Sequence, residues 1–354
     1  MRVLVTGSEG YIGTLLCPYL VAQGHEVVGV DAGFYAAAHL YEDDGEARFE
    51  RRREDIRRLT AADLKGFDAV VHMAELSNDP LGQLAPTITY EINHHGSVDL
   101  ASAAKVAGVS RFVYTSSCSV YGAADQDIVD EESPLHPQTA YAMCKQLVEQ
   151  DVALLADDAF TPTFLRNATA CGASPRLRFD IVLNNLCGLA WTTREIRMES
   201  DGTPWRPIVH ALDICQAIAR TLEAPVERVH NEILNVGDTD GNYRIREIAE
   251  VVGQVFQGCT VTVAGRSPDA RSYRVSFAKI HETLPGFRCE WNAEASARQL
   301  LDVFTRVQLS EEDFRSRDYT RLRQIEHLLR AGEIDRSFFW TAERPAAHVE
   351  TSAN

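Results

Sequence analysis

Short apolar runs alternate with segments of helical spacing through the first 170 residues of the chain. Short apolar runs predict buried strands, whereas apolar residues that recur with the helical period predict helices with one buried face. The predicted strands are Arg2–Thr6, Glu26–Val30, Ala69–His72, Arg111–Thr115 and Thr163–Leu165, and the predicted helices cover Ile12–Gln23, about Ile92–Ala107 and about Ala140–Leu155. Strands that alternate with helices in this way predict an α/β fold, with a parallel sheet covered on both faces.

The pattern changes at about Cys171, where Pro, Arg, Asn and Trp become frequent. We expect a return to the sheet near Ala211–Leu222 (helix) and Glu232–Val236 (strand), followed by a helix at Arg246–Phe256, a strand at Thr260–Val263 and charged helices between Ser310 and Ala331. The predicted organisation is a sheet domain over residues 1–170 with a return segment at about 208–240, a second lobe from 171–207 and 241–340, and a flexible tail at 341–354. The apolar spacing of Arg321–Leu329 indicates core or a subunit contact.

Composition and charge narrow the class of protein. The chain has 354 residues, and 35 Lys and Arg against 51 Asp and Glu give a formal net charge of −16. This balance argues against a nucleic-acid or membrane partner, since both require a basic surface. Eight cysteines without a CxxC pair, with no signal peptide and no membrane-length apolar run, predict a soluble, reduced, cytoplasmic protein. Because His94, His95 and His210 have no ligand-like companions, no metal site is predicted.

A glycine-rich loop joins the first predicted strand to the first predicted helix. Thr6–Gly13 has the spacing GxxGxxG. Gly7 would allow a tight turn, Gly10 would let the backbone approach a pyrophosphate, and Gly13 would let the helix pack on the strand. The helix N-terminus would offer its unpaired N–H groups to the phosphates. The alternative is an ordinary glycine-rich turn beside a surface Asp.

Asp31 follows the second predicted strand, near the spacing at which an acid binds the ribose hydroxyls of adenosine. A carboxylate there would repel a 2′-phosphate, so NAD is favoured over NADP as the cofactor. A basic run downstream could offset that charge, but its distance along the chain favours a solvated face interleaved with Glu50 and Glu54. The basic run consists of Arg48, Arg51, Arg52 and Arg53.

Tyr141 and Lys145 stand four residues apart on a predicted helix, and therefore on one face of it. A nearby ammonium favours the phenolate and would lower the Tyr pKa toward the range of a general base. Upstream, the hydroxyl-rich stretch Tyr114–Gly122 follows a predicted strand at the edge where open α/β sheets bind ligands. The alternative for the Tyr–Lys pair alone is a surface helix pair.

Together these motifs resemble the extended short-chain dehydrogenase/reductase family, and most closely its NAD-dependent nucleotide-sugar epimerase/dehydratase branch. The resemblance extends to about residue 300 and rests on an ordered set: TGxxGxxG, Asp31, Asp55–Ile56, His72–Met73–Ala74, Asn93, SSCSVYG and YxxxK. It implies a Rossmann-type doubly wound sheet over residues 1–170 that binds NAD, with a smaller C-terminal substrate-binding lobe. It also implies a homodimer formed through helices of the first domain.

The resemblance implies roles for individual residues. Tyr141 would be the base, Lys145 would bind the nicotinamide ribose and lower the Tyr pKa, and Ser117 would bond the reacting hydroxyl. The implied cofactor residues are Gly7, Gly10, Tyr11, Ile12, Gly13, Asp31, Asp55, Ile56, Ala74, Asn93, Ser116, Tyr141 and Lys145. The implied substrate residues are Ser77, Asn78, Ser117, Asn185, Arg206, Asp269 and Arg271, with Arg176 and Arg178 as weaker candidates. For any one of these arginines, a surface or inter-lobe salt bridge is the alternative.

Departures from the family pattern bear on the reaction. The dehydratases of this branch carry Asp-Glu after the catalytic hydroxyl residue, where this chain has Cys118 and Ser119, so dehydration is disfavoured. We interpret Cys118 and Cys144 as small buried hydrophobes. Glu75 and Asp79 are open to two interpretations, as a second acid/base or sugar ligand, or, for Asp79, as a helix cap with Asn78.

The sequence therefore predicts an NAD-dependent epimerase of a nucleotide-diphosphate sugar. The hydroxyl would be oxidised transiently to a keto-sugar, position 4 being the expected target, and the hydride would then return on the other face. A reductase or dehydrogenase of a nucleotide-linked keto-sugar is the alternative within the same chemistry. A catalytically silent dinucleotide-binding sensor is the alternative outside enzymes, and the presence of Ser117, Tyr141 and Lys145 argues against it.

Overall fold

The computed structural model of the chain describes residues 1–36, 39–41, 48–77, 79–123, 127–263 and 271–342. Two predicted substrate residues, Asn78 and Asp269, lie outside the described residues, as does nearly all of the predicted tail at 341–354. Among the described residues, no helix is long and apolar enough to cross a membrane.

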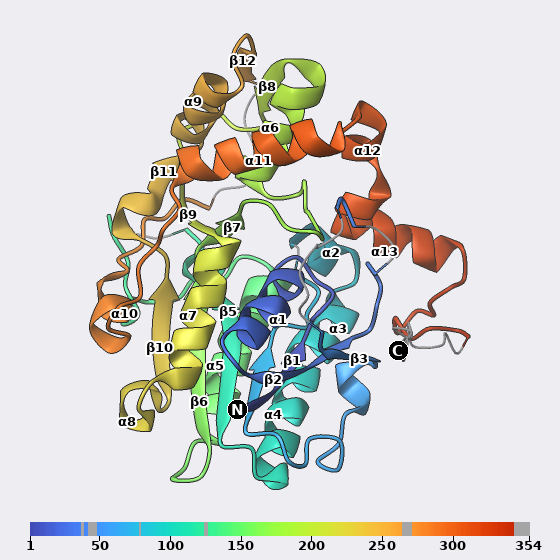
Figure 1. Cartoon of the computed structure of the whole chain (residues 1–354), viewed down its shortest axis with the longest axis vertical. Helices are drawn as coiled ribbons and strands as arrows, with labels where there is room; N and C mark the ends of the chain where they lie inside the picture. The colour runs from blue at the N-terminus through green and yellow to red at the C-terminus, as the bar shows by residue number, and fades with distance from the viewer. Residues whose placement is uncertain (37–38, 42–47, 78, 124–126, 264–270, 343–354) are drawn as a thin grey trace, which may run out of the picture.

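Seven parallel strands form the central sheet (Figure 1). Their spatial order is β10 (Glu232–Val236), β6 (Thr161–Asn167), β5 (Arg111–Ser117), β4 (Ala69–His72), β1 (Arg2–Thr6), β2 (Glu26–Asp31) and β3 (Glu50–Arg53). The predicted Rossmann-type parallel sheet is thus confirmed, and so is the return of residues 232–236 to its edge. Strand β3, which the sequence analysis interpreted as a solvated face, pairs with β2.

Alternate strand residues point to opposite faces of the sheet, and each face is covered by its own helices. Val3 and Val5 pack in one apolar cluster with α1 (Gly13–Ala22) and α7 (Ala211–Glu223). Leu4 packs in another cluster with α4 (Gly96–Ala107) and α5 (Ala140–Ala153). Because these strands are buried on both faces, their sequences are continuous apolar runs.

The strand order reverses direction beside β1. The chain runs from β1 to β2 and β3 on one side, then crosses to β4 on the other. In open α/β sheets, ligands bind at such a switch point, outside the carboxyl ends of the strands. The loops that follow β1, β2, β4 and β5 therefore surround the expected binding site.

The second lobe lies beyond those carboxyl ends, in the upper part of Figure 1. Two small sheets belong to it, one of β11 (Asn242–Arg244), β9 (Trp205–His210) and β7 (Thr169–Cys171), the other of β12 (Thr260–Val263) and β8 (Glu195–Met198). Its helices α6 (Val182–Thr193), α9 (Ile245–Val255) and α11 (Ala293–Val307) share an apolar cluster. Helix α6 was not predicted, because burial on several sides leaves it without a clean polar stripe.

Shorter helices connect these units. They are α2 (Asp79–Leu84), α3 (Pro86–Thr89), α8 (Val226–Val229), α10 (Ala278–Thr283), α12 (Glu311–Arg315) and α13 (Arg321–Arg330), with a π-helical turn at Tyr90–His95 before α4. The predicted helix at Ile92–Ala107 therefore begins in that turn. Cys118–Tyr121, after β5, forms a 3₁₀ turn capped by the Ser117 side chain.

Two segments of the predicted second lobe pack instead on elements of residues 1–170. Residues between Tyr273 and Phe287 join the cluster that holds β1 and α1. Residues of α13, together with Ile334 and Phe338, pack against Phe34 and Ile56 in the loops after β2 and β3. The exact division into domains stays a prediction, but the C-terminal segment touches the first unit directly.

Candidate active site

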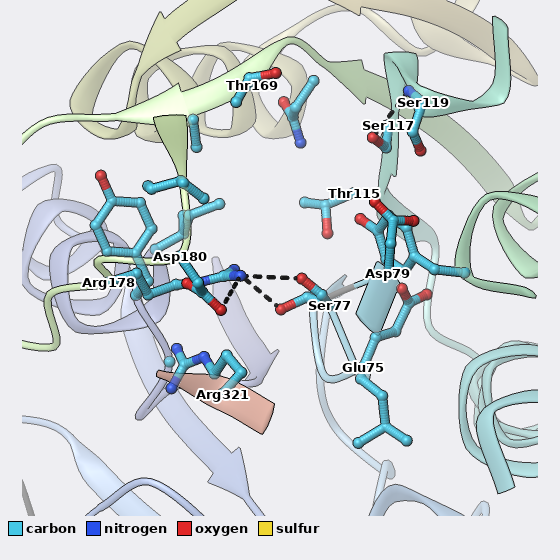
Figure 2. Close-up of a pocket in the computed structure, with 18 of the residues that line it drawn as sticks. Glu75, Ser77, Asp79, Thr115, Ser117, Ser119, Thr169, Arg178, Asp180 and Arg321 are labelled. Atoms are coloured by element: carbon cyan, nitrogen blue, oxygen red, sulfur yellow. Dashed lines mark hydrogen bonds and ion pairs between the residues drawn. The ribbon is translucent and has the colours of Figure 1, made fainter. Parts of the chain in front are cut away.

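A cavity of about 690 Å³ opens at the carboxyl ends of the central strands (Figure 2). Its walls come from the loops after β1, β2, β4 and β5, from α5, and from the start of α6. The predicted residues that line it are Gly7, Gly10, Tyr11, Ile12, Gly13, Asp31, Asp55, Ile56, Ala74, Ser77, Ser116, Ser117, Tyr141, Lys145, Asn185, Arg206 and Arg271. One cavity thus unites residues that are spread over most of the sequence.

In the glycine loop at the N-terminus of α1, two positions can be occupied only by glycine. Gly7 has a φ of +78°, and a Cβ there would lie 2.9 Å from the backbone nitrogen of Ala74. A Cβ on Gly13 would lie 2.1 Å from the carbonyl oxygen of Gly7. Gly10 lines the cavity next to the open N-terminus of α1. The loop therefore fits a bound pyrophosphate, which needs close backbone approach and N–H donors.

Asp31 ends β2 at the rim of the cavity. One carboxylate oxygen accepts a hydrogen bond from the Gly33 backbone N–H at 2.7 Å, and the other accepts one from Glu9 at 3.1 Å. Burial raises the pKa of Asp31, and these two backbone bonds oppose that rise. The anchored Asp31 carboxylate has lone pairs left to accept hydrogen bonds from the two hydroxyls of an adenosine ribose, so Asp31 also fits bound NAD.

The basic run lies on β3, the edge strand next to the strand that ends in Asp31. The sequence analysis favoured a solvated face, interleaved with Glu50 and Glu54, for the run of Arg48, Arg51, Arg52 and Arg53. The parallel pairing of β2 and β3 makes Arg53 the direct neighbour of Asp31 across the strands. The Arg53 side chain also lies close over Gly33. Arg52 pairs with the exposed Glu50 at 2.7 Å, as expected of a solvated face, while strand pairing places Arg53 beside Asp31.

Four predicted cofactor residues differ in whether they line the cavity and in which group they present to it: Asp55, Ile56, Ala74 and Asn93. Ile56 and Ala74 present apolar surface to it, while the Asp55 carboxylate is engaged by Arg57 at 2.6 Å. Asn93 is not among the lining residues. Its amide oxygen accepts from the Leu76 backbone N–H at 2.8 Å, and its amide nitrogen donates to the Leu76 carbonyl at 3.2 Å. Asn93 therefore holds the loop after β4 in place from outside the cavity.

Tyr11 and Ser116 also line the cavity with their polar groups already bonded. The Tyr11 hydroxyl donates to the carbonyl of Gly172 at 2.7 Å and so ties the glycine loop to the second lobe. The Ser116 hydroxyl donates to the Glu149 carboxylate at 2.5 Å, and Glu149 is paired with the buried Arg166. Both side chains brace the walls of the site.

Ser117, Tyr141 and Lys145 come together where β5 meets α5. Thr139 caps α5, with its hydroxyl oxygen accepting from the Ala142 N–H at 3.1 Å. The Lys145 Nζ lies 5.5 Å from the centroid of the Tyr141 ring and donates to the carbonyl of Thr115. The Ser117 side chain acts on the Tyr141 phenol and lowers its pKa. All three residues line the same cavity.

Glu75 is a fourth member of this cluster. Its Oε2 lies 2.6 Å from Lys145 Nζ, and the two side chains are only 1% and 4% exposed. Its Oε1 accepts a hydrogen bond from the Tyr114 hydroxyl at 2.5 Å. Burial opposes the charge of Lys145, but Glu75, Tyr141 and Glu149 together outweigh burial, so the pKa of Lys145 lies above its ordinary value. Burial raises the pKa of Glu75, while Lys145 and the Tyr114 hydroxyl lower it. The 2.6 Å contact with an ammonium favours the carboxylate form of Glu75.

This pairing changes the expected acidity of Tyr141. Burial raises the pKa of Tyr141, Lys145 lowers it, and Glu75 raises it again. Lys145 acts in the predicted direction, but the net shift is upward rather than toward a working range near neutrality. The sequence analysis named Glu75 and Lys145 separately and had no signal that they would meet.

The substrate candidates lie along the far wall, where the second lobe closes the cavity. Figure 2 shows Arg178 reaching across to Ser77, whose hydroxyl accepts from it at 3.2 Å, while Arg178 also pairs with Asp180 at 2.8 Å. The Asn185 amide nitrogen donates to the Phe179 carbonyl at 2.9 Å. Arg178 thus joins the two walls of the cavity.

Arg206 and Arg271 lie together in this wall. Arg206 donates to the backbone carbonyl of Arg271 at 2.5 Å. Arg271 is paired with Asp79 at 2.5 Å, and Asp79 accepts from the Thr139 hydroxyl at 2.6 Å. Asp79 is also the first residue of α2. The salt-bridge alternative therefore holds for Arg271 as the chain stands, and Asp79 couples this arginine to the start of α5.

The cysteines beside the catalytic candidates are buried. The thiol of Cys118 donates to the carbonyl of Arg166 at 3.2 Å, and burial raises its pKa. Burial also raises the pKa of Cys144 to about 12. Neither thiol lines the cavity as an ionised group, in agreement with their interpretation as small hydrophobes. Within the described ranges, no group of three or more His, Cys, Asp or Glu residues is arranged to hold a metal ion.

Comparison with known proteins agrees with this geometry. A sequence model of the NAD dependent epimerase/dehydratase family matches residues 3–237. A UDP-glucose 4-epimerase from Streptomyces lividans is 29% identical over 72% of this chain and 80% of its own length.

Solved structures give the same picture. A UDP-glucose-4-epimerase from Stenotrophomonas maltophila, solved with NAD and formylated UDP-arabinopyranose, has 26% identity and a TM-score of 0.73 over 87% of this chain and 99% of its own. An NAD dependent NDP-hexosamine 5,6-dehydratase of tunicamycin biosynthesis has a TM-score of 0.77 over 86% of this chain and 98% of its own. Because this dehydratase is only 23% identical to the chain, the likeness between them is one of fold.

Proposed function

The chain belongs to the NAD dependent epimerase/dehydratase family, and from that premise we propose that it is an NAD-dependent 4-epimerase of a nucleotide-diphosphate sugar. The observation that carries the proposal is the convergence of Ser117, Tyr141 and Lys145 on the cavity that the glycine loop also lines. The buried Cys118 and the hydroxyl of Ser119 stand where a dehydrating enzyme needs a carboxylic acid and a carboxylate. This supports epimerisation over elimination of water.

NAD is the cofactor of this family, and when bound it accepts a hydride from a sugar carbon and returns a hydride to it. Gly7, Gly10 and Gly13 would hold its pyrophosphate at the start of α1, and Asp31 would hold the adenosine ribose. Ile56 would contact the adenine, and Ala74 would lie along the cofactor. Lys145 would bond the ribose next to the reacting end.

Tyr141 is the base of the proposed reaction. Its phenolate would accept the proton of the sugar hydroxyl and would keep that proton while the sugar carbon is a ketone. It would return the proton to the same oxygen when the carbon is reduced again, so the net reaction consumes neither protons nor reducing equivalents. Ser117, which lines the same cavity, would hold the sugar oxygen in line with the phenol.

The diphosphate of the substrate would lie against the far wall. Arg206 and Arg271 present guanidinium groups there, which match phosphate oxygens in shape and charge. Because Arg271 is held by Asp79, a bound diphosphate would share Arg271 with that carboxylate or displace it. Asn185, at the start of α6, would donate to the same diphosphate. The homodimer stays a prediction.

The proposal is tested first by native mass spectrometry of the purified protein, which should retain NAD. A panel of nucleotide-diphosphate sugars is then screened for conversion to their 4-epimers without added reductant. We expect conversion with no net change in nicotinamide absorbance. Stoichiometric use of NADPH for each product would contradict the proposal and would favour the reductase.

A pair of variants separates catalysis from folding. Tyr141→Phe should abolish epimerisation, while Tyr19→Phe, which changes a tyrosine of α1 outside the cavity lining, should leave it intact. Both proteins should retain NAD. If Tyr141→Phe keeps full activity, Tyr141 is not the base and the proposed mechanism fails.

A further inference from the structure

The C-terminal segment covers the loop that follows Asp31. The Gln324 amide nitrogen on α13 donates to the carbonyl of Phe34 at 3.1 Å. The Trp340 indole nitrogen donates to the carbonyl of Ala32 at 2.6 Å. Because Asp31 is the predicted ribose ligand, the chain from α13 to Trp340 fastens the backbone next to the proposed adenosine site.

The same segment also touches the other side of that site. Arg57 donates to the carbonyl of Ser337 at 2.8 Å, next to Asp55 and Ile56. Ile56 shares an apolar cluster with Ile325 and Leu328 of α13. The family match ends at residue 237, so this wall is built by a part of the chain that the match does not cover.

Arg321, at the start of α13, is the charged group that this wall presents to the cavity. It lines the cavity although the residue is only 5% exposed. Its guanidinium stacks on the Tyr35 ring, 3.9 Å from the centroid. In the described part of the chain, no carboxylate forms an ion pair with Arg321, whereas Arg178 beside it is held by Asp180 (Figure 2).

Burial and two neighbouring cations oppose the charge of Arg321, and Tyr35 and Asp180 offset them only in part. Burial lowers the pKa of Arg321 to about 10, and the neighbouring charges of Arg178 and Arg176 add to that fall. The charges of Arg321 and Arg176 also reach Asp31, where they lower the pKa of the carboxyl. A buried cation among other cations is costly, and an anion entering the cavity would relieve that cost.

We propose that Arg321 binds a phosphate group of the dinucleotide cofactor, so that the C-terminal segment supplies a third wall of the cofactor site beside the glycine loop and Asp31. A planar guanidinium held flat on an aromatic ring is well suited to phosphate oxygens, because few side-chain rotations are lost on binding. The inference rests on NAD as the cofactor of the proposed function. It does not require epimerisation.

Two phosphates of such a cofactor share this chemistry, the pyrophosphate and the 2′-phosphate of NADP. The Asp31 carboxylate would repel a 2′-phosphate, which favours the pyrophosphate of NAD. Ligands that differ in one group at a time distinguish the two. Adenosine has no phosphate, ADP has the diphosphate, NAD⁺ has the full pyrophosphate and NADP⁺ adds the 2′-phosphate.

Isothermal titration calorimetry on the full chain, freed of retained nucleotide, measures the affinity for each ligand. Arg321→Gln should weaken NAD⁺ and ADP by about tenfold or more, the range of a lost charge-assisted hydrogen bond, and leave adenosine unchanged. Arg323→Gln is the matched control, because Arg323 lies exposed on the same helix. It should change none of the affinities.

Other outcomes would overturn the assignment. If Arg321→Gln binds NAD⁺ and ADP as the unaltered protein does, Arg321 does not contact a phosphate. A loss confined to NADP⁺ would move the contact to the 2′-phosphate, against the stated choice of the pyrophosphate. If Arg321→Gln folds poorly, the ADP affinity of Arg321→Lys tests the proposal instead. This variant keeps the charge but not the planar fork, so it should weaken ADP by several-fold, and an unchanged ADP affinity would refute the proposal. If the unaltered protein binds NAD⁺ but epimerises no nucleotide sugar, that result would count against the proposed function alone.

Discussion

Replacing Glu75 by Gln removes the negative charge that neutralises Lys145 and keeps nearly the same shape. The Glu75 carboxylate is in contact with Lys145 on one oxygen and with the Tyr114 hydroxyl on the other. Asp79 and Glu149 are the other carboxylates near this cluster, and His72 and Cys144 flank it. With Gln at position 75, Lys145 keeps its bond to the Thr115 carbonyl and acts on Tyr141 without its counter-charge. We therefore expect the pKa of Tyr141 to fall.

The size of the fall can be worked from the geometry. Nζ of Lys145 lies 5.5 Å from the Tyr141 ring centroid and 2.6 Å from Oε2 of Glu75. The carboxylate is therefore no more than about 8 Å from the ring, and at an effective dielectric constant of about 20 its repulsion of a phenolate is about 2 kcal/mol. This corresponds to a fall of about 1.5 pKa units in the variant.

A spectroscopic titration measures this without a substrate. The phenolate absorbance of the protein is followed against pH and compared with that of its Tyr141→Phe form, which isolates Tyr141 from the other ten of the eleven tyrosines. Glu75→Gln, titrated against the double variant, should ionise Tyr141 at lower pH. Once a substrate is known, the acidic limb of the activity profile should move in the same direction. A Tyr141 titration that stays in place or moves to higher pH would show that Glu75 does not set its acidity.

Three further predictions concern the loop, the far wall and a buried histidine. Gly13→Ala should lower both the melting temperature and the NAD⁺ affinity, because its Cβ would collide with the Gly7 carbonyl; an unchanged affinity would mean the loop does not touch the cofactor. Arg271→Lys should weaken nucleotide diphosphates by about tenfold with NAD⁺ binding unchanged; equal loss of both would point to a purely structural role. Burial lowers the pKa of His210 to about 4, so its folded form resists protonation. Stability should be full above pH ~6.5, where the unfolded histidine is also neutral, and should fall by on the order of 2 kcal/mol by pH 5. In urea titrations at pH 8 and 5, His210→Asn should reduce that fall, and an identical fall would exclude His210 as its source.

Much of the fold could be predicted because it is written in local patterns. The strands Arg2–Thr6, Glu26–Asp31 and Ala69–His72 are short apolar runs buried on both faces, and their boundaries follow from the residues themselves. The spacing of Tyr141 and Lys145 guarantees a shared helix face for the same reason. Where local pattern was weak, as in α6, the prediction was missing, because surrounding helices decide which side of it is buried.

The sequence by itself determined the apolar strands of the sheet, the glycine loop and the identity of the catalytic candidates, since each depends on residues that are close together in the chain. Only the tertiary structure decided the electrostatics of the site. Glu75 contacts Lys145, 70 positions away in the chain; strand pairing places Arg53 opposite Asp31; and Arg321 lines the cavity from the far end of the chain. Charge acts through space and depends on burial, and neither separation nor burial can be read from the order of residues.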